Sequence, residues 1–244
     1  MVRLSVNVNK VATLRNSRGG DQPRVLDAVN VCVAAGVRGI TVHPRADLRH
    51  ITPTDVRDLA RRLESVRPDI EFNMEGDPRP DFIELVHEVR PEQCTIVPVV
   101  PGEITSQAGW QRGRDTDRLP DIIGSMKARG IRVSLFVDPD TDAIQLASDV
   151  GADRVELYTE PFARAFERGR SDAERSFQQY AGAAREAHAR GLGVNAGHDL
   201  DVDNLVLFRM LPHLDEVSIG HAIISRALFV GLDTVVREYL AVLA

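Results

Sequence analysis

Residues 131–159, IRVSLFVDPDTDAIQLASDVGADRVELYT, contain one complete structural repeat and decide the fold. The repeat opens with IRVSLFV and closes with DRVELYT, two short runs rich in Val, Leu and Ile that predict strands buried on both faces. Between them, Ala143–Val150 has helical periodicity, with Asp140 as a candidate N-cap and Gly151 as the glycine that ends the helix. The stretch therefore predicts a strand, a helix and a second strand.

The same alternation runs through the whole chain. A glycine follows several helical segments, as at Gly36, Gly130 and Gly191, because glycine tolerates the left-handed conformation that ends helices. Thr52 is another candidate N-cap, with Pro53 at the first helical position. The eight predicted strands begin at Arg3, Arg38, Ile70, Gln93, Ile131, Asp153, Leu192 and Asp215.

Eight strands in strict alternation with helices predict a parallel sheet with right-handed crossovers, and eight strands close a (βα)8 TIM barrel. An open doubly wound sheet is the alternative, but it often starts with a glycine-rich nucleotide turn that this sequence lacks. The chain has 244 residues, close to the roughly 250 of one barrel, and no Pro/Gly-rich linker divides it. We expect one α/β domain over residues 1–244.

Two connections are longer than a usual strand-to-helix loop. Asn9–Gln22 follows the first strand and Val99–Arg118 follows the fourth. Long ordered loops at the carboxyl ends of barrel strands carry lids and substrate contacts. We expect Val99–Arg118 to act as a lid, with Gly102 and Gly109 as hinges.

Composition and charge exclude several classes of protein. The net charge is −6 with no basic block, which argues against nucleic-acid binding. Cys32 and Cys94 stand in unrelated contexts, which argues against a metal site or a CxxC pair and favours a reducing compartment. No stretch approaches the ~18 uninterrupted apolar residues of a membrane helix, and no signal-peptide run is present. We expect a cytoplasmic protein with no membrane partner.

Polar residues gather at the ends of the predicted strands, in a barrel otherwise expected to consist largely of Val, Ile and Leu. Barrel active sites form at this end. His43 ends the second strand, Glu75 ends the third, and His198 follows the seventh. A single histidine there is as often structural as functional, but four of the seven histidines fall on this rim: His43, His50, His198 and His221. Other polar residues at the same end include Asn7, Asn9, Arg45, Thr105, Glu156 and Thr159.

Glu75 has two interpretations. A carboxylate desolvated by the barrel would have a raised pKa and suit proton transfer, or it could form an ion pair with Arg45 or Lys10. Histidines with a glutamate could also bind a metal, but His43 and His198 lie on distant strands and no HxH or HxxxH pair occurs. We favour general acid–base chemistry and expect no metal.

Phosphate binding is the second expectation. Gly220-His221-Ala222 stands where the eighth strand passes into a helix, and Gly197-His198-Asp199 has the same place after the seventh. Backbone N–H groups at such helix starts favour phosphate. Arg18 and Arg45 offer further anion contacts on loops. Two neighbouring arginines are explained as ordinary surface charge: Arg15 and Arg49.

Five segments together resemble the pyridoxine 5′-phosphate synthase family, in the family's order and over almost the whole chain. They are NVNKVATLRNSRGG from Asn7, GITVHPRADLRHI from Gly39, FNMEG from Phe72, VNAGHDL from Val194 and IGHAIISRAL from Ile219. The family makes vitamin B6 by the deoxyxylulose-dependent route. The resemblance implies condensation of 1-deoxy-D-xylulose 5-phosphate with 3-amino-2-oxopropyl phosphate, closure of the pyridine ring, and release of phosphate and water without a cofactor.

The resemblance also implies roles for single residues. His43 and Glu75 match the family's general bases, and His198 matches its proton donor. The residues that match contacts to the deoxyxylulose phosphate are Arg45, His50 and Thr105. Those that match contacts to the amino-ketone phosphate are Asn7, Arg18, Asp199, Gly220 and His221. The family further implies a homo-oligomer, an octamer built from dimers.

One departure from the family concerns Asn9-Lys10, where better-known members carry Asp-His. In the family, these two positions contact the deoxyxylulose substrate. The change removes a negative charge and adds a cation. It is compatible with a subgroup of the same activity, which we favour, or with a shifted substrate.

Two other functions stay open. One is a phosphosugar lyase or aldolase barrel with a Schiff-base lysine, for which only Lys10 is placed, because Lys127 falls on a helix. The other is a non-catalytic barrel that binds phosphate ligands.

Overall fold

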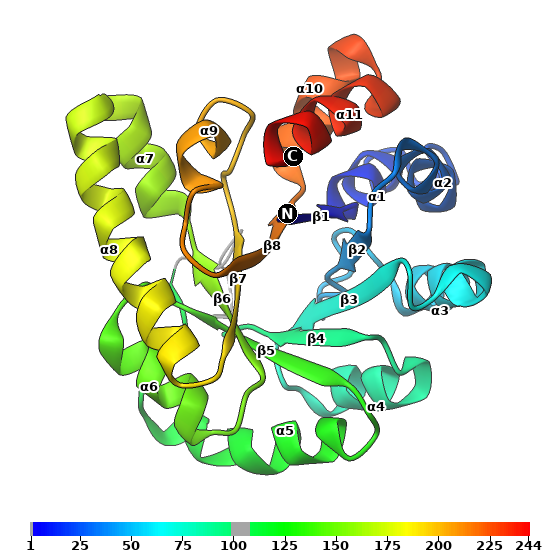
Figure 1. Cartoon of the computed structure of the whole chain (residues 1–244). Helices are drawn as coiled ribbons and strands as arrows, with labels where there is room; N and C mark the ends of the chain where they lie inside the picture. Colours follow the sequence, from blue (N-terminus) through cyan, green and yellow to red (C-terminus); the bar gives the residue numbers. More distant parts are fainter. Residues whose placement is uncertain (1, 99–107) are drawn as a thin grey trace.

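The structure, a computed structural model, describes residues 2–98 and 108–244 and contains a closed barrel of eight parallel strands in sequential order (Figure 1). Each strand pairs with the next, and the first pairs with the last. The expected single-domain (βα)8 TIM barrel is confirmed. The strands are β1 (Arg3–Asn7), β2 (Gly39–Val42), β3 (Glu71–Gly76), β4 (Gln93–Ile96), β5 (Arg132–Val137), β6 (Arg154–Tyr158), β7 (Gly193–Gly197) and β8 (Leu214–Ile219).

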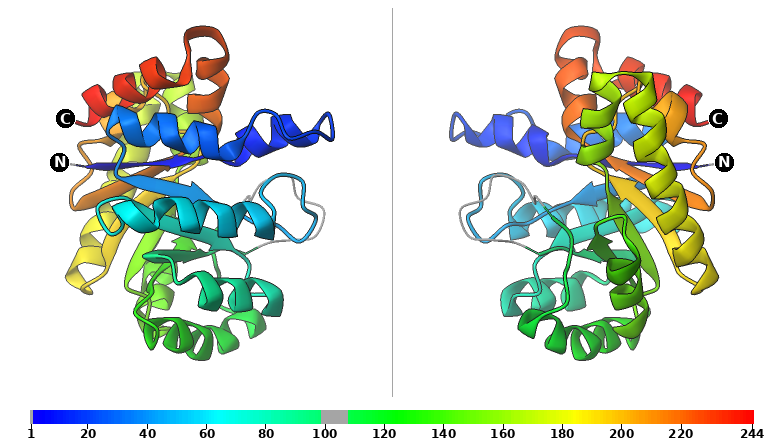
Figure 2. Two further views of the ribbon diagram at one scale, coloured as in Figure 1. Left: turned by 90° about the vertical axis from the view of Figure 1, so that its right-hand side faces the viewer. Right: turned by 90° about the vertical axis from the view of Figure 1, so that its left-hand side faces the viewer.

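Helices surround the barrel, and α1 projects past the carboxyl ends of the strands (Figure 2). The helices of the described residues are α1 (Asn9–Asn16), α2 (Val25–Ala35), α3 (Pro53–Leu63), α4 (Pro80–Val89), α5 (Leu119–Lys127), α6 (Thr141–Asp149), α7 (Glu160–Arg168), α8 (Arg170–Ala189), α9 (Leu205–Phe208), α10 (His221–Val230) and α11 (Leu232–Leu243). Short 3-10 turns are η1 (Glu64–Val66) and η2 (Arg114–Arg118). None of the helices formed by residues 2–98 and 108–244 has the length and apolar character that crossing a bilayer requires.

The helix boundaries follow the signals in the sequence. Asp140 accepts a hydrogen bond from the Ala143 backbone N–H at 2.8 Å, so it caps α6 as expected. Thr52 forms a capping box with Asp55 at the start of α3. Gly151, after α6, has a φ of +81°, the left-handed conformation that favours glycine. Asp140 and Thr52 thus fix where α6 and α3 begin, and Gly151 turns the chain from α6 toward the next strand.

The aliphatic residues of the strands face the helices rather than the barrel axis. In β3, Phe72 and Met74 belong to the hydrophobic core, while Asn73 and Glu75 alternate with them on the other face. The expectation that Val, Ile and Leu make up most of the barrel therefore describes its outer layer only. Alternation along each strand sends the polar residues inward.

Hydrogen bonds join the inward side chains of neighbouring strands. Ser5 and Thr41 are 2.7 Å apart, and the Asn73 amide donates to Thr41 at 3.2 Å. Thr95 Oγ1 lies 3.1 Å from Asn73 Oδ1 and 3.3 Å from the Glu156 carboxyl. This network satisfies polar groups that would be costly to bury alone.

Asn9–Gln22 is not the long loop that the sequence suggested, because its first half forms α1. The helix follows β1 almost at once and buries Val11 and Ala12 against the barrel. Arg15, on the same helix, makes a two-pronged ion pair with Asp55 at 2.5 and 2.9 Å. The pair fixes α1 to the capping box of α3.

Residues 99–107 of the expected Val99–Arg118 lid, Gly102 included, lie outside the described residues. Gly109, its other expected hinge, donates its N–H to the Asp138 carboxylate at 3.2 Å. A Cβ on Gly109 would lie 2.3 Å from the Asp138 backbone nitrogen, so glycine is required here by close approach to the end of β5. Trp110 is buried beside it, and its backbone N–H donates to the Phe136 carbonyl at 2.9 Å.

Removing the cap of α6 tests whether the local signal stabilises the repeat. Asp140→Ala should lower the free energy of unfolding by about 1 kcal/mol, because the Ala143 N–H loses its partner. For a chain of this size that corresponds to a melting temperature about 2–4 °C lower. Asp140→Ser keeps an oxygen acceptor and should retain most of the stability. Equal losses in both variants would show that the cap contributes nothing.

Candidate active site

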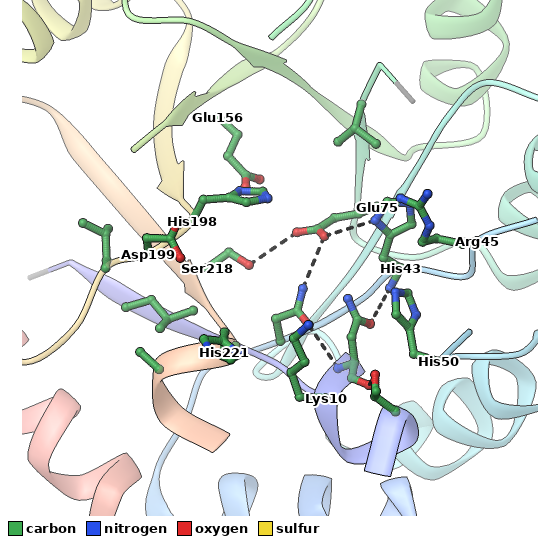
Figure 3. A pocket seen from close by; sticks show the side chains of 18 of the residues that line it. Lys10, His43, Arg45, His50, Glu75, Glu156, His198, Asp199, Ser218 and His221 are labelled. Carbon is green, nitrogen blue, oxygen red and sulfur yellow. Dashed lines mark hydrogen bonds and ion pairs between the residues drawn. The ribbon is translucent and has the colours of Figure 1, made fainter. Parts of the chain in front are cut away.

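A cavity of about 430 Å³ opens at the carboxyl ends of the strands. It brings together eleven residues expected from the sequence: Asn7, Asn9, Lys10, His43, Arg45, His50, Glu75, His198, Asp199, Gly220 and His221. Figure 3 shows Glu75 in the middle, with His43 and Arg45 on one side and His198 and Glu156 on the other. The candidate catalytic residues therefore share one enclosed space, although they come from three different strand ends.

Three arginines of the neighbouring loops and of α1 differ in whether they line the cavity. Arg18 is exposed on the turn after α1 and does not line the cavity. Arg49, interpreted from the sequence as surface charge, does line it. Arg15 lies outside the cavity in its ion pair with Asp55. Thr105 falls outside the described residues.

Glu75 has neutral neighbours at hydrogen-bonding distance. The Asn7 amide donates to Oε2 at 3.3 Å, Ser218 Oγ donates to Oε1 at 3.5 Å, and His43 Nδ1 lies 3.9 Å from Oε2. Burial, with a smaller contribution from the charge of Glu216, raises the pKa of Glu75 to about 8, although the Ser218 hydrogen bond acts in the opposite direction. The carboxyl therefore holds its proton at neutral pH.

His43 is the complementary group. Burial lowers its pKa well below the usual 6.5, and the positive charge of Arg45 and the neighbouring His50 lower it further. The imidazole is therefore neutral at pH 7. Its Nε2 is buried without a hydrogen-bond partner among the described residues, so a basic nitrogen stays available in the wall of the cavity.

Two asparagines at the end of β1 fix these groups. Asn9 Oδ1 accepts the His43 backbone N–H at 2.9 Å, and Asn7 Oδ1 accepts the Asn9 backbone N–H at 3.0 Å. Because the Asn7 amide also donates to Glu75, the chain from β1 holds both His43 and Glu75. These bonds also fix which end of the Asn7 amide is the oxygen and which is the nitrogen, and they place the Asn9 amide oxygen toward His43.

One wall of the cavity is cationic. Lys10, Arg45 and Arg49 line it beside His50. Burial, together with the charges of Arg45 and Lys10, lowers the pKa of His50 to about 4, although Asp47 acts in the opposite direction. Asp47 pairs with Arg45 at 3.5 Å and with Arg49 at 2.5 Å and so orients both. The wall has the chemistry of an anion site.

His198 follows β7 in a tight turn rather than at a helix start, because α9 begins only at Leu205. His198 has a φ of +84° and Asp199 a φ of +57°, which few non-glycine residues adopt. The His198 ring lies 5.0 Å from the Phe136 ring and 5.5 Å from the Tyr158 ring. Burial lowers the pKa of His198, whereas Asp199 and a ring hydrogen bond to the Gly197 backbone raise it.

Glu156 belongs to the same cavity, although the sequence indicated only that it lies near a strand end. It is 2% exposed, and burial followed by the charges of Glu75 and Glu216 raises its pKa well above the usual value. A Cβ on Gly197 would lie 2.6 Å from Glu156 Oε1, so glycine leaves room for this carboxyl. The alternation of inward residues along β6 was the signal that could have identified Glu156.

The opposite end of the cavity is formed by the turn from β8 into α10. The expected helix start is confirmed, with Gly220 as the N-cap and His221 as the first helical residue. A Cβ on Gly220 would lie 2.8 Å from the Asn7 carbonyl oxygen, so the turn packs closely on β1. Helix N-termini of this kind bind phosphate through free N–H groups.

Among residues 2–98 and 108–244, no group of three or more His, Cys, Asp or Glu side chains is placed to hold a metal ion. The groups present are protonated carboxyls, neutral imidazoles, a cationic wall and a helix N-terminus. Such an arrangement can bind an anionic ligand and move protons in both directions on it.

Comparison with known proteins gives one family. The model of "Pyridoxal phosphate biosynthesis protein PdxJ" matches residues 4–244. A pyridoxine 5′-phosphate synthase of Porphyromonas gingivalis is 51% identical over 240 residues, 98% of each chain. One of Christiangramia forsetii is 50% identical over 244 residues, the full length of both chains.

Solved structures with low identity share the fold. Thiamine phosphate pyrophosphorylase from Pyrococcus furiosus superposes with a TM-score of 0.63 at 11% identity, covering 99% of this chain and 95% of that one. Phosphoribosyl anthranilate isomerase from Thermus thermophilus gives 0.60 at 15% identity, covering 99% and 98%. At this identity they support the barrel architecture alone.

The raised pKa of Glu75 should make Glu75→Gln a stabilising change at alkaline pH. The unfolded carboxyl ionises near pH 4.5, whereas the folded one stays protonated to about pH 8, so stability is lost as pH rises through that window. The amide of the Glu75→Gln variant does not ionise, so the variant does not lose stability over this pH range. Its melting temperature should exceed that of the wild type by several degrees more at pH 8 than at pH 4, at about 2–4 °C per kcal/mol.

Glu84→Gln, on the exposed face of α4, is the matched control for loss of a carboxylate. Equal differences between wild type and Glu75→Gln at both pH values would contradict the protonated state of Glu75.

Proposed function

The chain belongs to the pyridoxal phosphate biosynthesis protein PdxJ family, and from that membership we propose how its barrel mouth works. It is a pyridoxine 5′-phosphate synthase, an enzyme of vitamin B6 biosynthesis that acts on phosphorylated small molecules. The proposal concerns the substrates and the residues. It takes 1-deoxy-D-xylulose 5-phosphate and 3-amino-2-oxopropyl phosphate as the pair that is condensed to the pyridine ring, with release of phosphate and water.

Two substrate phosphates require two anion sites, and the cavity has two ends of suitable chemistry. The cationic wall with Arg45 and His50 is assigned to the deoxyxylulose phosphate. The start of α10 at Gly220 and His221 is assigned to the amino-ketone phosphate. Asn7 and Asp199 complete that second end. Figure 3 shows Glu75 between His198 on one side and His43, Arg45 and His50 on the other, so the two substrates would meet beside Glu75.

The proton transfers are assigned to three groups, of which His43 rests in the protonation state that its role needs, while Glu75 and His198 reach theirs during the reaction. Neutral His43 accepts a proton from the first substrate through a free ring nitrogen, as a general base. Glu75 serves as the second base once its own proton has passed to the substrate or to His43, 3.9 Å away. His198, whose pKa burial lowers, first takes up a proton released by the substrates and then supplies it to the leaving oxygen. Protonated Glu156 can donate a hydrogen bond to negative charge that develops nearby.

The Asn9-Lys10 departure is compatible with the same reaction. Asn9 uses its side-chain oxygen to accept the His43 N–H, and an aspartate could accept the same bond. Its local role therefore survives the loss of charge. Lys10 adds a cation to the wall assigned to phosphate. These observations support an unchanged substrate, with Asn9 and Lys10 as contacts rather than catalytic residues.

The lyase or aldolase alternative would need Lys10 as the Schiff-base residue, because Lys127 lies outside the cavity and pairs with Asp153 at 2.8 Å. Lys10 does line the cavity, but the names of the full-length relatives favour the synthase.

We also infer a cytoplasmic homo-oligomer, with an octamer built from dimers as the expected form. The exposed apolar end of α10 gives this some support, since Leu228 is 67% and Phe229 88% exposed. Arg18 does not line the cavity of the single chain. Arg18 is therefore left out of the substrate contacts assigned above.

The observation that carries the proposal is the buried pair of neutral imidazole and protonated carboxyl formed by His43 and Glu75. Purified protein mixed with both substrates should release phosphate and form pyridoxine 5′-phosphate, which is followed by the absorbance of its pyridine ring. Neither substrate alone should give either product. Absence of turnover together with tight binding of phosphate ligands would instead favour a binding barrel.

Variants of the three catalytic candidates should separate chemistry from folding. His43→Ala, Glu75→Gln and His198→Ala should each lower kcat on the order of 10²- to 10⁴-fold, since each removes a proton-transfer group. Circular dichroism should show the fold intact. His188→Ala, an exposed histidine on α8, is the control and should keep full activity. Full activity in any of the three would remove that residue from the mechanism.

A further inference from the structure

Thr159 lies at the junction of β6 and α7, behind the cavity rather than in its wall. Its side chain is completely buried. The hydroxyl lies 2.5 Å from the Gly197 carbonyl oxygen and also within hydrogen-bonding distance of the His198 carbonyl oxygen. Its backbone N–H donates to Gly197 as well, at 3.0 Å. One residue just after β6 thus holds two consecutive carbonyl groups where β7 passes into its turn.

The backbone held in this way is one that few side chains tolerate. His198 and Asp199 both have positive φ angles, +84° and +57°. Such a conformation persists in non-glycine residues when surrounding contacts over-determine it. The hydroxyl of Thr159, with one proton shared between two carbonyl oxygens, is such a contact.

The imidazole has neighbours of its own. The Gly197 backbone raises the pKa of the His198 ring. Phe136 and Tyr158 confine the ring at centroid distances of 5.0 and 5.5 Å. Tyr158 is itself fixed, because Tyr180 donates its hydroxyl proton to the Tyr158 carbonyl at 2.6 Å. Thr159 therefore acts on His198 through the backbone, while the aromatic rings limit where the imidazole can go.

We propose that Thr159 is a positioning residue for His198: its hydroxyl holds the Gly197–His198 turn so that the imidazole stays directed into the cavity. Its effect on turnover rests on the proposed role of His198 as proton donor. The orientation of the ring is a separate matter, which a measurement on the free protein can test.

Three variants test the proposal. Thr159→Val keeps the shape of the side chain and removes the hydroxyl, and Thr159→Ser keeps the hydroxyl. Ser125→Ala is the control, because Ser125 also donates its hydroxyl to a carbonyl, that of Ile122, but on α5 outside the barrel. Each is assayed for kcat and KM with both substrates, and the His198 ring signals are followed by NMR, assigned by their loss in His198→Ala.

We expect Thr159→Val to lower kcat about 10- to 100-fold with a smaller change in KM, since a misplaced proton donor affects the chemical step more than binding. The His198 ring signals should shift or broaden in the same variant. Thr159→Ser should restore both kcat and the signals, and Ser125→Ala should match the wild type.

Wild-type kcat and wild-type His198 signals in Thr159→Val would overturn the proposal. Equal losses in the Val and Ser variants would overturn it too, because Thr159→Ser keeps the hydroxyl and would then fail to restore what Thr159→Val loses. If Thr159→Val does not fold, Thr159→Ser decides: wild-type signals and kcat support the hydroxyl, and shifted signals refute it. If the wild type itself shows no turnover, the proposed reaction fails, while the NMR comparison still decides whether Thr159 orients His198.

Discussion

The removal of Glu75 from water, with no cation of residues 2–98 and 108–244 at hydrogen-bonding distance, is the constraint on which the rest of the site depends. The carboxyl contacts an asparagine amide, a serine hydroxyl and the edge of a neutral imidazole. An ionised carboxylate would need stronger compensation than these groups give, so the proton stays on Glu75 at neutral pH. The same burial keeps His43 neutral. The resting pair is therefore poised for proton transfer and carries no net charge.

The fold makes this arrangement possible by separating two kinds of core. The aliphatic side chains of the strands pack outward against the helices and stabilise the barrel, as Phe72 and Met74 do in β3. The inward positions are then free to hold a hydrogen-bonded polar network that includes Thr41, Asn73 and Thr95. Stability and chemistry thus use opposite faces of the same strands. Changes on the outer face should affect folding, while changes on the inner face should affect the site.

Much of this could be predicted from the sequence, because strand ends and helix caps are local signals. The positions of His43, Glu75 and Gly220 followed from counting strands and asking what comes last in each. Glu156 was not identified as a site residue, because its place depends on which residues of β6 face inward, and strand pairing decides that. The turn at His198 was expected to start a helix, and that prediction was wrong. His198 and Asp199 have positive φ angles, and the His198 carbonyl contacts Thr159, 39 positions away in the sequence, which local signals do not indicate.

The protonation state of Glu75 is the central claim, and isotope-edited infrared spectroscopy tests it directly. Protein with ¹³C-labelled glutamate carboxyl groups is compared with the same protein carrying Glu75→Gln, and the difference isolates this residue from Glu156 and Glu216. We predict a protonated carboxyl band for Glu75 at pH 7 that gives way to a carboxylate band as the pH passes about 8. A carboxylate band at pH 7 would show that Glu75 is ionised in the resting enzyme and would contradict the account.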